Sequence, residues 1–187
     1  MVIIKNYTGD LINFKAAVDM IKAQYGPSHG VNIRTLDVGD DVALLDSQGS
    51  MKPRGVAGTV LVYKILGGAG FKGKNLDHLC ELGDYVMKNM GTMGVSMLSC
   101  SLPGQALSHP LGENQIEIGM GIHGEKGKYV CDWMECKELV GKILTSLNDH
   151  EAIKAGLQDS NSEWIAMVNN LGCVTNLEMT LIVNEFT

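Results

Sequence analysis

A histidine enclosed by glycines is the residue of this sequence best suited to chemistry. His123 lies in the segment GIHGE (residues 121–125), at the end of a stretch, 115–122, in which apolar and polar residues alternate as in a β-strand. Glycines at the end of a strand let a ligand approach the backbone closely, so Gly121 is a candidate substrate-binding position. The imidazole could act there as nucleophile, base or metal ligand. A hydrogen-bonded structural histidine is the competing interpretation.

A lysine and a carboxylate follow the first predicted strand. Residues 2–4 are Val-Ile-Ile, which predicts a buried strand, and Lys5 stands at its end. Asp10 precedes a helix that the apolar spacing predicts over residues 11–25. The ordinary role of Asp10 would be that of an N-cap. Ligands of α/β proteins, however, bind beyond the carboxyl ends of parallel strands, so Lys5 and Asp10 are also candidates for contact with a substrate.

Two glycine-rich segments partly match nucleotide-binding motifs. Residues 68–75 nearly fit GxxxxGK[ST], but Asn75 replaces the hydroxyl residue that binds Mg²⁺. A turn between two helices with Asn75 as N-cap is the alternative, and a phosphate-loop nucleotide binder centred on Lys74 stays open. Residues 119–124 fit GxGxxG in form, but no helical pattern follows and positions 142–146 hold no acidic residue.

Composition excludes several classes of protein. The 187 residues are 45% hydrophobic and 19% charged, which suits a packed core, and the net charge is −6. That charge argues against nucleic acid or an anionic membrane as partner, and no apolar stretch is long enough to span a bilayer. The five cysteines, without any CxxC pair, predict free thiols in a reducing, cytoplasmic environment. Cys131 and Cys136 lack the spacing of a structural zinc site, so we expect no bound metal.

The scaffold of these candidates is predicted to alternate strands and helices. Strands are expected at residues 2–4, 31–36, 42–45, 93–98, 115–122 and 164–168. Helices are expected at 11–25, 75–89 and 134–147, with a last helix opened by the capping box of Thr175 and Glu178. Residues 55–70 include a strand-like run at 60–63, but the long apolar stretch with alanines favours a helix there. Residues 102–114 are expected to be loop and 149–162 exposed polar chain. The pattern predicts an α/β fold with a mixed, largely parallel sheet flanked by helices.

Two strands carry further expectations. The β-α-β opening predicts parallel pairing through a right-handed crossover. Because the strand at 2–4 looks buried on both faces, it needs neighbours on both sides, and the exposed edge predicts a homo-oligomer or a complementary chain. In the strand at 115–122, Ile116 and Ile118 are expected on one face and Gln115 and Glu117 on the other.

Several segments together resemble the substrate-binding domain of the dihydroxyacetone (glycerone) kinase family. They are VIIKNYTGD with NF (2–10, 13–14), GDDVA (39–43), RGVAGTV (54–60), GTMGVS (91–96), EIGMGIHGE (117–125) and VNNLG (168–172). The segments extend nearly from end to end, and their number and order make the resemblance specific. Because the family's domain is longer, this sequence resembles a truncated, central portion of a two-lobed domain, with residues 1–90 in the first α/β lobe and 91–187 starting the second.

The resemblance implies a role for each candidate residue. In the family the histidine of GIHGE, His123 here, attacks the ketone of dihydroxyacetone and forms a covalent hemiaminal. The aspartate of NYTGD, Asp10 here, is the acid/base at the hydroxyl that receives phosphate, and the lysine before that motif, Lys5 here, contacts the substrate. A covalent bond to a carbonyl would select ketones over polyols. Since only a neutral imidazole attacks, capture should weaken in acid.

No cofactor is expected on this chain itself. The resemblance implies that a nucleotide-binding helical domain or subunit supplies the phosphate donor, either ATP with Mg²⁺ or a phosphoprotein with bound ADP, and the sequence does not choose between them. The resulting hypothesis is the dihydroxyacetone-binding part of glycerone kinase, a phosphotransferase of glycerol metabolism whose turnover by this chain alone is in doubt. A non-catalytic paralogue that senses dihydroxyacetone as a coregulator is the alternative.

Overall fold

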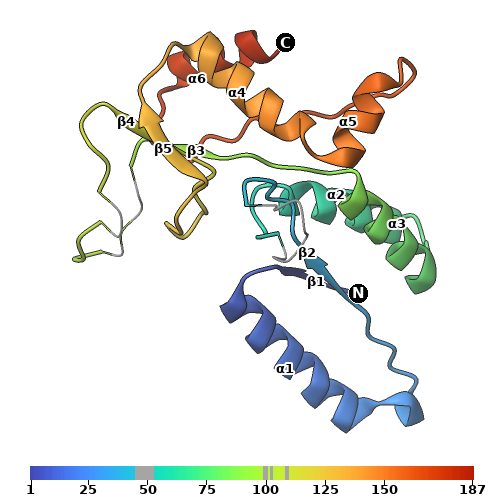
Figure 1. The fold of residues 1–187 in the computed structure, drawn as a ribbon. Helices are drawn as coiled ribbons and strands as arrows, with labels where there is room; N and C mark the ends of the chain where they lie inside the picture. The colour runs from blue at the N-terminus through green and yellow to red at the C-terminus, as the bar shows by residue number, and fades with distance from the viewer. Residues whose placement is uncertain (45–52, 99–100, 102, 108–109) are drawn as a thin grey trace. The chain divides into compact units, whose positions relative to one another are not determined.

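The computed structural model describes residues 1–44, 53–98, 101, 103–107 and 110–187. The chain divides into two compact units. The first comprises Met1–Asp40 with Ser47–Met90, and the second comprises Asp41–Asp46 with Gly91–Thr187. Each unit contains its own sheet and helices (Figure 1) and is described by itself.

The first unit is built on a parallel pair of strands. β1 (Val2–Lys5) pairs with β2 (Thr35–Val38) over all four residues of each strand. The connection consists of α1 (Thr8–Tyr25) and a 3₁₀ turn at Pro27–His29, and α1 packs against β1 (Figure 1). The parallel pairing predicted for the β-α-β opening is therefore confirmed.

Two further helices complete the first unit. α2 (Thr59–Phe71) packs against α3 (Leu76–Lys88), and α3 packs against β2. The buried core of this unit consists of aliphatic residues from β2 and α2, namely Leu36, Val38, Val62 and Leu66. Burial of each such side chain contributes about 1.5–3 kcal/mol, so this cluster holds α2 and the strands together.

The second unit joins an antiparallel sheet to three helices. β3 (Val95–Ser96), β4 (Gln115–Ile118) and β5 (Tyr129–Asp132) follow one another across the sheet, with β4 in the centre. The helices are α4 (Cys136–Asn148), α5 (Glu151–Gln158) and α6 (Asn176–Phe186). α4 packs against both α5 and α6 (Figure 1), and buried Ile116, Ile118, Val140 and Ile153 come from β4, α4 and α5.

The mixed α/β class is confirmed. The helices predicted over residues 11–25, 55–70, 75–89 and 134–147 correspond to α1–α4, with bounds that differ by a few residues. The capping box of Thr175 and Glu178 opens α6 with both of its reciprocal hydrogen bonds. Among the described strands, the parallel pair lies in the first sheet and the strands of the second unit pair antiparallel; parallel pairing in the second unit is limited to an isolated bridge.

Three predicted strands are shorter, displaced or absent. The strand expected at 31–36 lies at Thr35–Val38, and that expected at 93–98 is reduced to Val95–Ser96. The described part of 42–45 forms no strand, although neighbouring Asp41 makes an isolated parallel bridge with Thr92; residue 45 itself lies outside the described residues. A strand needs a partner at the right place, and an apolar run alone does not reveal that partner.

The prediction was also wrong over the chain that follows β4. Residues 129–132 form β5, which was not predicted, and residues 151–158 form α5 where exposed polar chain was expected. Residues 164–168, predicted as a strand, pair with no strand in the part of the chain that the structure describes. Apolar Trp164 and Ile165 are 43% and 80% exposed there. Their composition is typical of a strand, but no described strand lies beside them as a partner.

The cysteines and the helices bear on two expectations from composition. Cys80, Cys131, Cys136 and Cys173 are free thiols, and Cys100 lies outside the described residues. Over the ranges given above, every helix is too short or too polar to cross a bilayer.

Candidate functional site

The predicted histidine lies in the loop that joins β4 to β5, residues 119–128, called the histidine loop below. Its two ends are tied down by backbone hydrogen bonds. The Gly119 N–H donates to the Gly94 carbonyl at 2.7 Å, and the Lys128 N–H donates to the Ile118 carbonyl at 2.8 Å. Gly119 has a φ of +81°, a left-handed conformation that favours glycine. The loop therefore begins and ends at fixed points on the sheet.

Glu125 holds His123 in two ways. Its Oε1 lies 3.0 Å from Nδ1 of the His123 ring, and its Oε2 accepts the backbone N–H of His123 at 3.0 Å. The Glu125 carbonyl accepts the N–H of Gly121 at 3.0 Å, and the Gly121 carbonyl accepts the N–H of Gly124 at 3.1 Å. The His123 side chain is 42% exposed. The ring is thus oriented by a carboxylate and accessible to a small solute.

The charge on Glu125 decides which ring nitrogen carries a proton. Burial raises the pKa of Glu125, but hydrogen bonds from its own backbone N–H and from the His123 ring and backbone, with attraction to a charged ring, lower that pKa below its ordinary value. An ionised carboxylate only accepts hydrogen bonds, so a neutral His123 ring carries its proton on Nδ1. The lone pair then lies on Nε2, where the imidazole acts as a nucleophile or base.

A second glutamate, Glu117 of β4, lies at the base of the histidine loop. It is 2% exposed, and its Oε1 accepts the N–H of Gly127 at 2.6 Å. The alternating pattern had placed Glu117 with Gln115 on the polar face of the strand. Gln115 is indeed partly exposed, but Glu117 is buried because the loop returns to it through Gly127.

Sequence reasoning missed both glutamates as functional candidates. A signal existed for Glu125, because a carboxylate two residues after a histidine can reach back to its ring and backbone. No signal marked Glu117, because its burial depends on where the loop returns and not on the local pattern of β4.

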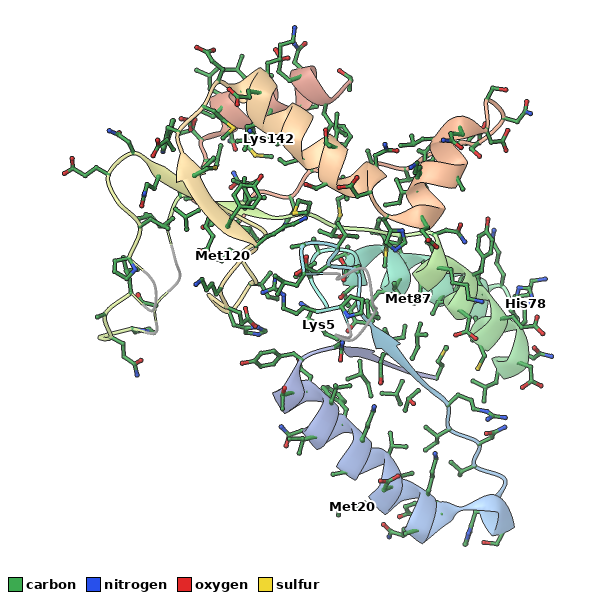
Figure 2. All side chains as sticks on the ribbon, viewed as in Figure 1. Lys5, Met20, His78, Met87, Met120 and Lys142 are labelled. Carbon is green, nitrogen blue, oxygen red and sulfur yellow. The ribbon has the colours of Figure 1, made fainter. Side chains whose placement is uncertain are left out.

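Lys5 and Asp10 lie on either side of the junction between β1 and α1. Lys5 ends β1 (Figure 2), and a Cβ at Gly55 would lie 2.4 Å from its Cγ and 2.7 Å from the Asn6 nitrogen. The Gly55 backbone therefore packs directly on the Lys5 stem. The N-cap of α1 is Tyr7, so the N-cap interpretation of Asp10 is wrong. Asp10 lies in the first helical turn, where the helix dipole favours a negative charge.

Asp40 fixes the glycine segment that follows in this unit, residues 53–58. Its carboxylate is 1% exposed. Oδ1 accepts the N–H of Val56 at 2.8 Å, and Oδ2 accepts the N–H of Gly58, the N-cap of α2, at 2.7 Å. One buried side chain thus holds the segment that contacts Lys5 and sets the start of a helix.

The four residues predicted from the sequence fall into two groups. Lys5 and Asp10 share the β1–α1 junction of the first unit. Gly121 and His123 share the histidine loop of the second unit. The structure brings the members of each group together within their own unit.

Neither nucleotide-binding alternative fits the fold. Gly68 and Gly70 lie inside α2, and Asn75 is the N-cap of α3, where its Oδ1 accepts the N–H of His78 at 2.9 Å. The phosphate-loop interpretation is therefore wrong, and the turn between two helices is confirmed. Residues 119–124 lead into β5, so the helix that a dinucleotide fingerprint needs does not follow them.

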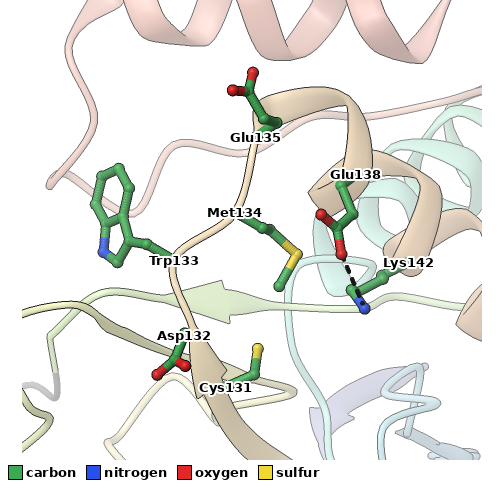
Figure 3. A pocket seen from close by; sticks show the side chains of 7 residues that line it. All are labelled: Cys131, Asp132, Trp133, Met134, Glu135, Glu138 and Lys142. Carbon is green, nitrogen blue, oxygen red and sulfur yellow. Dashed lines mark ion pairs between the residues drawn. The ribbon is translucent and has the colours of Figure 1, made fainter.

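A shallow hollow of about 780 Å³ lies at the start of α4 (Figure 3). Residues 131–135, Glu138 and Lys142 line it, and Glu138 Oε1 pairs with Lys142 Nζ at 3.3 Å. The β4–β5 register places this end of β5 opposite the start of β4, at the far end from the histidine loop. The hollow is therefore separate from the predicted site. Throughout the described ranges, three or more histidine, cysteine or acidic side chains do not gather as metal ligands.

Known proteins similar to this chain share one family. The Dak1 domain model matches residues 1–187. Dihydroxyacetone kinase 2 of Saccharomyces cerevisiae is 37% identical over 182 residues, which are 96% of this chain and 30% of that protein. The dihydroxyacetone-binding subunit DhaK of a PTS-dependent dihydroxyacetone kinase from Listeria innocua is 34% identical over 188 residues, 99% of this chain and 54% of that protein.

Solved structures give the same result. The native dihydroxyacetone kinase of C. freundii superposes with a TM-score of 0.82 at 35% identity, over 98% of this chain and 31% of that one. The dihydroxyacetone kinase operon co-activator Dha-DhaQ superposes with a TM-score of 0.86 at 28% identity, over 99% of this chain and 55% of that one. The chain thus spans from about a third to about half the length of the relatives that it matches.

Proposed function

Because this chain belongs to the Dak1 domain family, we propose that it is the dihydroxyacetone-binding part of a dihydroxyacetone kinase and holds the ketone for phosphoryl transfer. One observation carries the proposal: an exposed imidazole on a glycine loop, oriented by a carboxylate 3.0 Å from its Nδ1. The names of two relatives, a dihydroxyacetone kinase and a dihydroxyacetone-binding subunit, support the choice of substrate.

The chemical step is the addition of His123 to the ketone. Nε2 donates its lone pair to the carbonyl carbon, a C–N bond forms, and the carbon–oxygen π bond breaks to leave an alkoxide. As the ring becomes cationic, its Nδ1 proton passes to Glu125, while a water molecule protonates the alkoxide. Glu125 then gives its proton to the hydroxide that remains and returns to its ionised form. The product is a neutral hemiaminal with atoms and charge balanced. Polyols have no carbonyl carbon and cannot form it, so the step selects ketones.

Lys5, Asp10 and Gly121 complete the proposal. Asp10 would take the proton of the substrate hydroxyl as the phosphorus–oxygen bond forms, and the ammonium of Lys5 would contact the substrate oxygens. Gly121 would line the substrate beside His123, where the absence of a side chain permits a close approach. In this view residues 1–90, which contain Lys5 and Asp10, and residues 91–187, which contain Gly121 and His123, are two lobes of the dihydroxyacetone-binding domain.

The phosphate donor is proposed to come from outside this chain. A nucleotide-binding helical domain or subunit would deliver it, either as ATP with Mg²⁺ or as a phosphoprotein with bound ADP. Two relatives support these alternatives: one is described as PTS-dependent, and a C. freundii kinase structure is a complex with AMP-PNP and Mg²⁺. We expect this chain to capture the ketone alone and to turn it over only with such a partner.

The capture step can be tested with dihydroxyacetone labelled with ¹³C at the carbonyl carbon. Formation of the hemiaminal moves that resonance from the carbonyl to the tetrahedral region, and native mass spectrometry reports one bound ketone. We expect His123→Ala to abolish both signals, while His78→Ala, an exposed histidine of α3, leaves both unchanged. No adduct with the unmodified chain would overturn the proposal.

The transfer step is tested by adding a nucleotide-binding subunit of a related kinase with ATP and Mg²⁺. Asp10→Asn should keep the adduct but slow phosphorylation about 10²–10⁴-fold, as expected for loss of a general base. Asp19→Asn, an exposed aspartate of the same helix, is the matched control. Equal losses in both variants would contradict the role of Asp10.

A coregulator that senses dihydroxyacetone is the second candidate function. The similarity to the operon co-activator, with a TM-score of 0.86, favours it as the alternative. Such a protein would form the same adduct but would transfer no phosphate with any donor. The two experiments above therefore separate the functions, because only the kinase passes both.

We further propose that the chain self-associates or binds a complementary chain. Among the described strands, β1 hydrogen-bonds to β2 alone, which leaves its other edge available for pairing. An apolar edge strand of this kind is a template for another strand. A monomer by light scattering over a wide range of concentrations would contradict self-association.

A further inference from the structure

We propose that Glu117 is a positioning residue for His123: its buried carboxylate fixes the returning end of the histidine loop and thereby the place of the imidazole. The inference rests on the proposed function, since it concerns the ring that captures the ketone. Glu117 makes no contact with the substrate in this proposal and acts only through the loop.

The loop is closed at three levels, and Glu117 contributes a side-chain hydrogen bond at its base. Gly119 and Lys128 are bonded through their backbones, as described above. Between these ends, the N–H of Gly127 donates to Glu117 Oε1 at 2.6 Å. A Cβ at Gly127 would lie 2.5 Å from the Ile118 carbonyl oxygen and 2.8 Å from the Met120 nitrogen. Only a glycine can approach the strand closely enough to make this bond.

Burial of Glu117 points to a purpose beyond packing. The residue is 2% exposed, and Oε2 has no hydrogen-bond partner among the described residues. A buried carboxylate with one satisfied oxygen is less favourable than an apolar side chain of similar volume. An aliphatic residue would serve the core of β4 as well, so the bond to Gly127 is the feature that an aliphatic residue could not supply.

A short chain of contacts links Glu117 to the ring. Gly127 lies two residues after Glu125, whose carboxylate holds His123 at both Nδ1 and the backbone N–H. The Glu125 carbonyl also accepts the N–H of Gly121 across the loop. A shift of the backbone at Gly127 therefore moves Glu125, and Glu125 moves the imidazole.

The test uses the full chain with the variants Glu117→Ala and Glu117→Gln and with Glu113→Gln as the matched control. Glu113 is an exposed glutamate just before the same strand. We expect Glu117→Ala to weaken dihydroxyacetone adduct formation tenfold or more. Glu117→Gln should restore most of it, because the amide oxygen can accept the Gly127 N–H. Glu113→Gln should not differ from the unmodified chain.

A readout without substrate separates positioning from general stability. The His123 Nδ1–H proton, observed by NMR of the ring, and the exchange of the Gly121 amide report the loop itself. In Glu117→Ala both should exchange faster, while the amides of α4 and α6 keep their protection. An unchanged ring signal and an unchanged adduct in Glu117→Ala would overturn the inference.

The inference stays testable if Glu117→Ala does not fold or if the unmodified chain forms no adduct. If Glu117→Ala does not fold, Gly127→Ala takes its place, because the added Cβ forces the N–H away from Glu117; normal adduct formation in that variant overturns the inference. If the unmodified chain forms no adduct, the proposed function fails, and the ring and amide signals of the variants still decide whether Glu117 positions His123.

Discussion

Two glycine segments of this protein are each fixed by one buried carboxylate, but the two carboxylates are not equally satisfied. In the first unit, Asp40 accepts the N–H groups of Val56 and Gly58 with one oxygen each. In the second unit, Glu117 accepts the N–H of Gly127 with one oxygen, and its other oxygen has no partner among the described residues. Both side chains are 2% exposed or less.

The difference teaches what each carboxylate stabilises. Asp40 holds the segment at the start of α2, and both of its oxygens contribute hydrogen bonds, as in a structural cap. Glu117 holds a loop whose exposed residue is a histidine, and half of its bonding capacity is unused. Buried polar groups of native proteins are nearly always bonded, so an exception calls for an explanation. We attribute it to the need to place His123.

The largest loss of stability should come from removing Asp40, the carboxylate with both oxygens hydrogen-bonded. Asp40→Ala leaves two buried N–H groups without their acceptor, which should destabilise the first unit by about 2–4 kcal/mol. Glu117→Ala leaves one N–H group and removes an unsatisfied oxygen, so the histidine loop should lose only about 1–2 kcal/mol of stability. Amide hydrogen exchange, read in α2 for Asp40→Ala and at Gly121 in the histidine loop for Glu117→Ala, measures the two losses.

Asp84→Ala serves as the control for this comparison, because Asp84 is an exposed aspartate of α3 in the first unit. It should change protection in α2 by less than about 0.5 kcal/mol. Equal losses for Asp40→Ala and Glu117→Ala would remove the distinction between the two carboxylates.

A smaller loss of stability is expected from a substitution of Gly119, the glycine at the start of the histidine loop. Gly119 has a φ of +81°, and a Cβ there would lie 2.5 Å from the Cβ of Ala43. Gly119→Ala should therefore destabilise the second unit by about 2 kcal/mol through backbone strain and the close contact. Gly104 has a φ of +80° but open space around its Cβ position, so Gly104→Ala carries the strain alone, about 1 kcal/mol. Equal destabilisation in thermal unfolding would contradict the contact with Ala43.

Most helices of both units could be predicted from the sequence, whereas α5 and several strands could not. α1, α3 and α4 have apolar residues at helical spacing over 13 residues or more, so the signal is repeated several times. β3 has two residues and β5 has four, and their existence depends on pairing with β4. A pattern read along the chain contains no information about that partner.

The candidate site was predictable to a similar, partial extent. His123 and Gly121 could be found because a histidine among glycines is rare and lies after an alternating strand. Lys5 and Asp10 could be placed at one junction, but the N-cap role considered for Asp10 was wrong, because Tyr7 is the N-cap and Asp10 lies within the first turn of the helix. Glu117 could not be found, since its burial follows from the return of the loop ten residues later.

The smallest effect concerns pH, and it distinguishes the chemistry of the ring from the order of the loop. The pKa of Glu125 is lowered in the folded loop, so the ionised carboxylate stabilises that loop. This stabilisation is fully present above the ordinary pKa of a glutamate, about 4.3. It is lost as the pH falls through the lowered pKa. Adduct formation, by contrast, should already weaken as pH falls from about 8 to 5, because a protonated imidazole does not attack. The exchange of the His123 backbone N–H should stay slow across that range and increase only in stronger acid. Glu125→Gln cannot ionise, so the exchange rate of this N–H should not increase in acid in that variant. If the adduct and the loop order were lost at the same pH, the separate role of Glu125 would be contradicted.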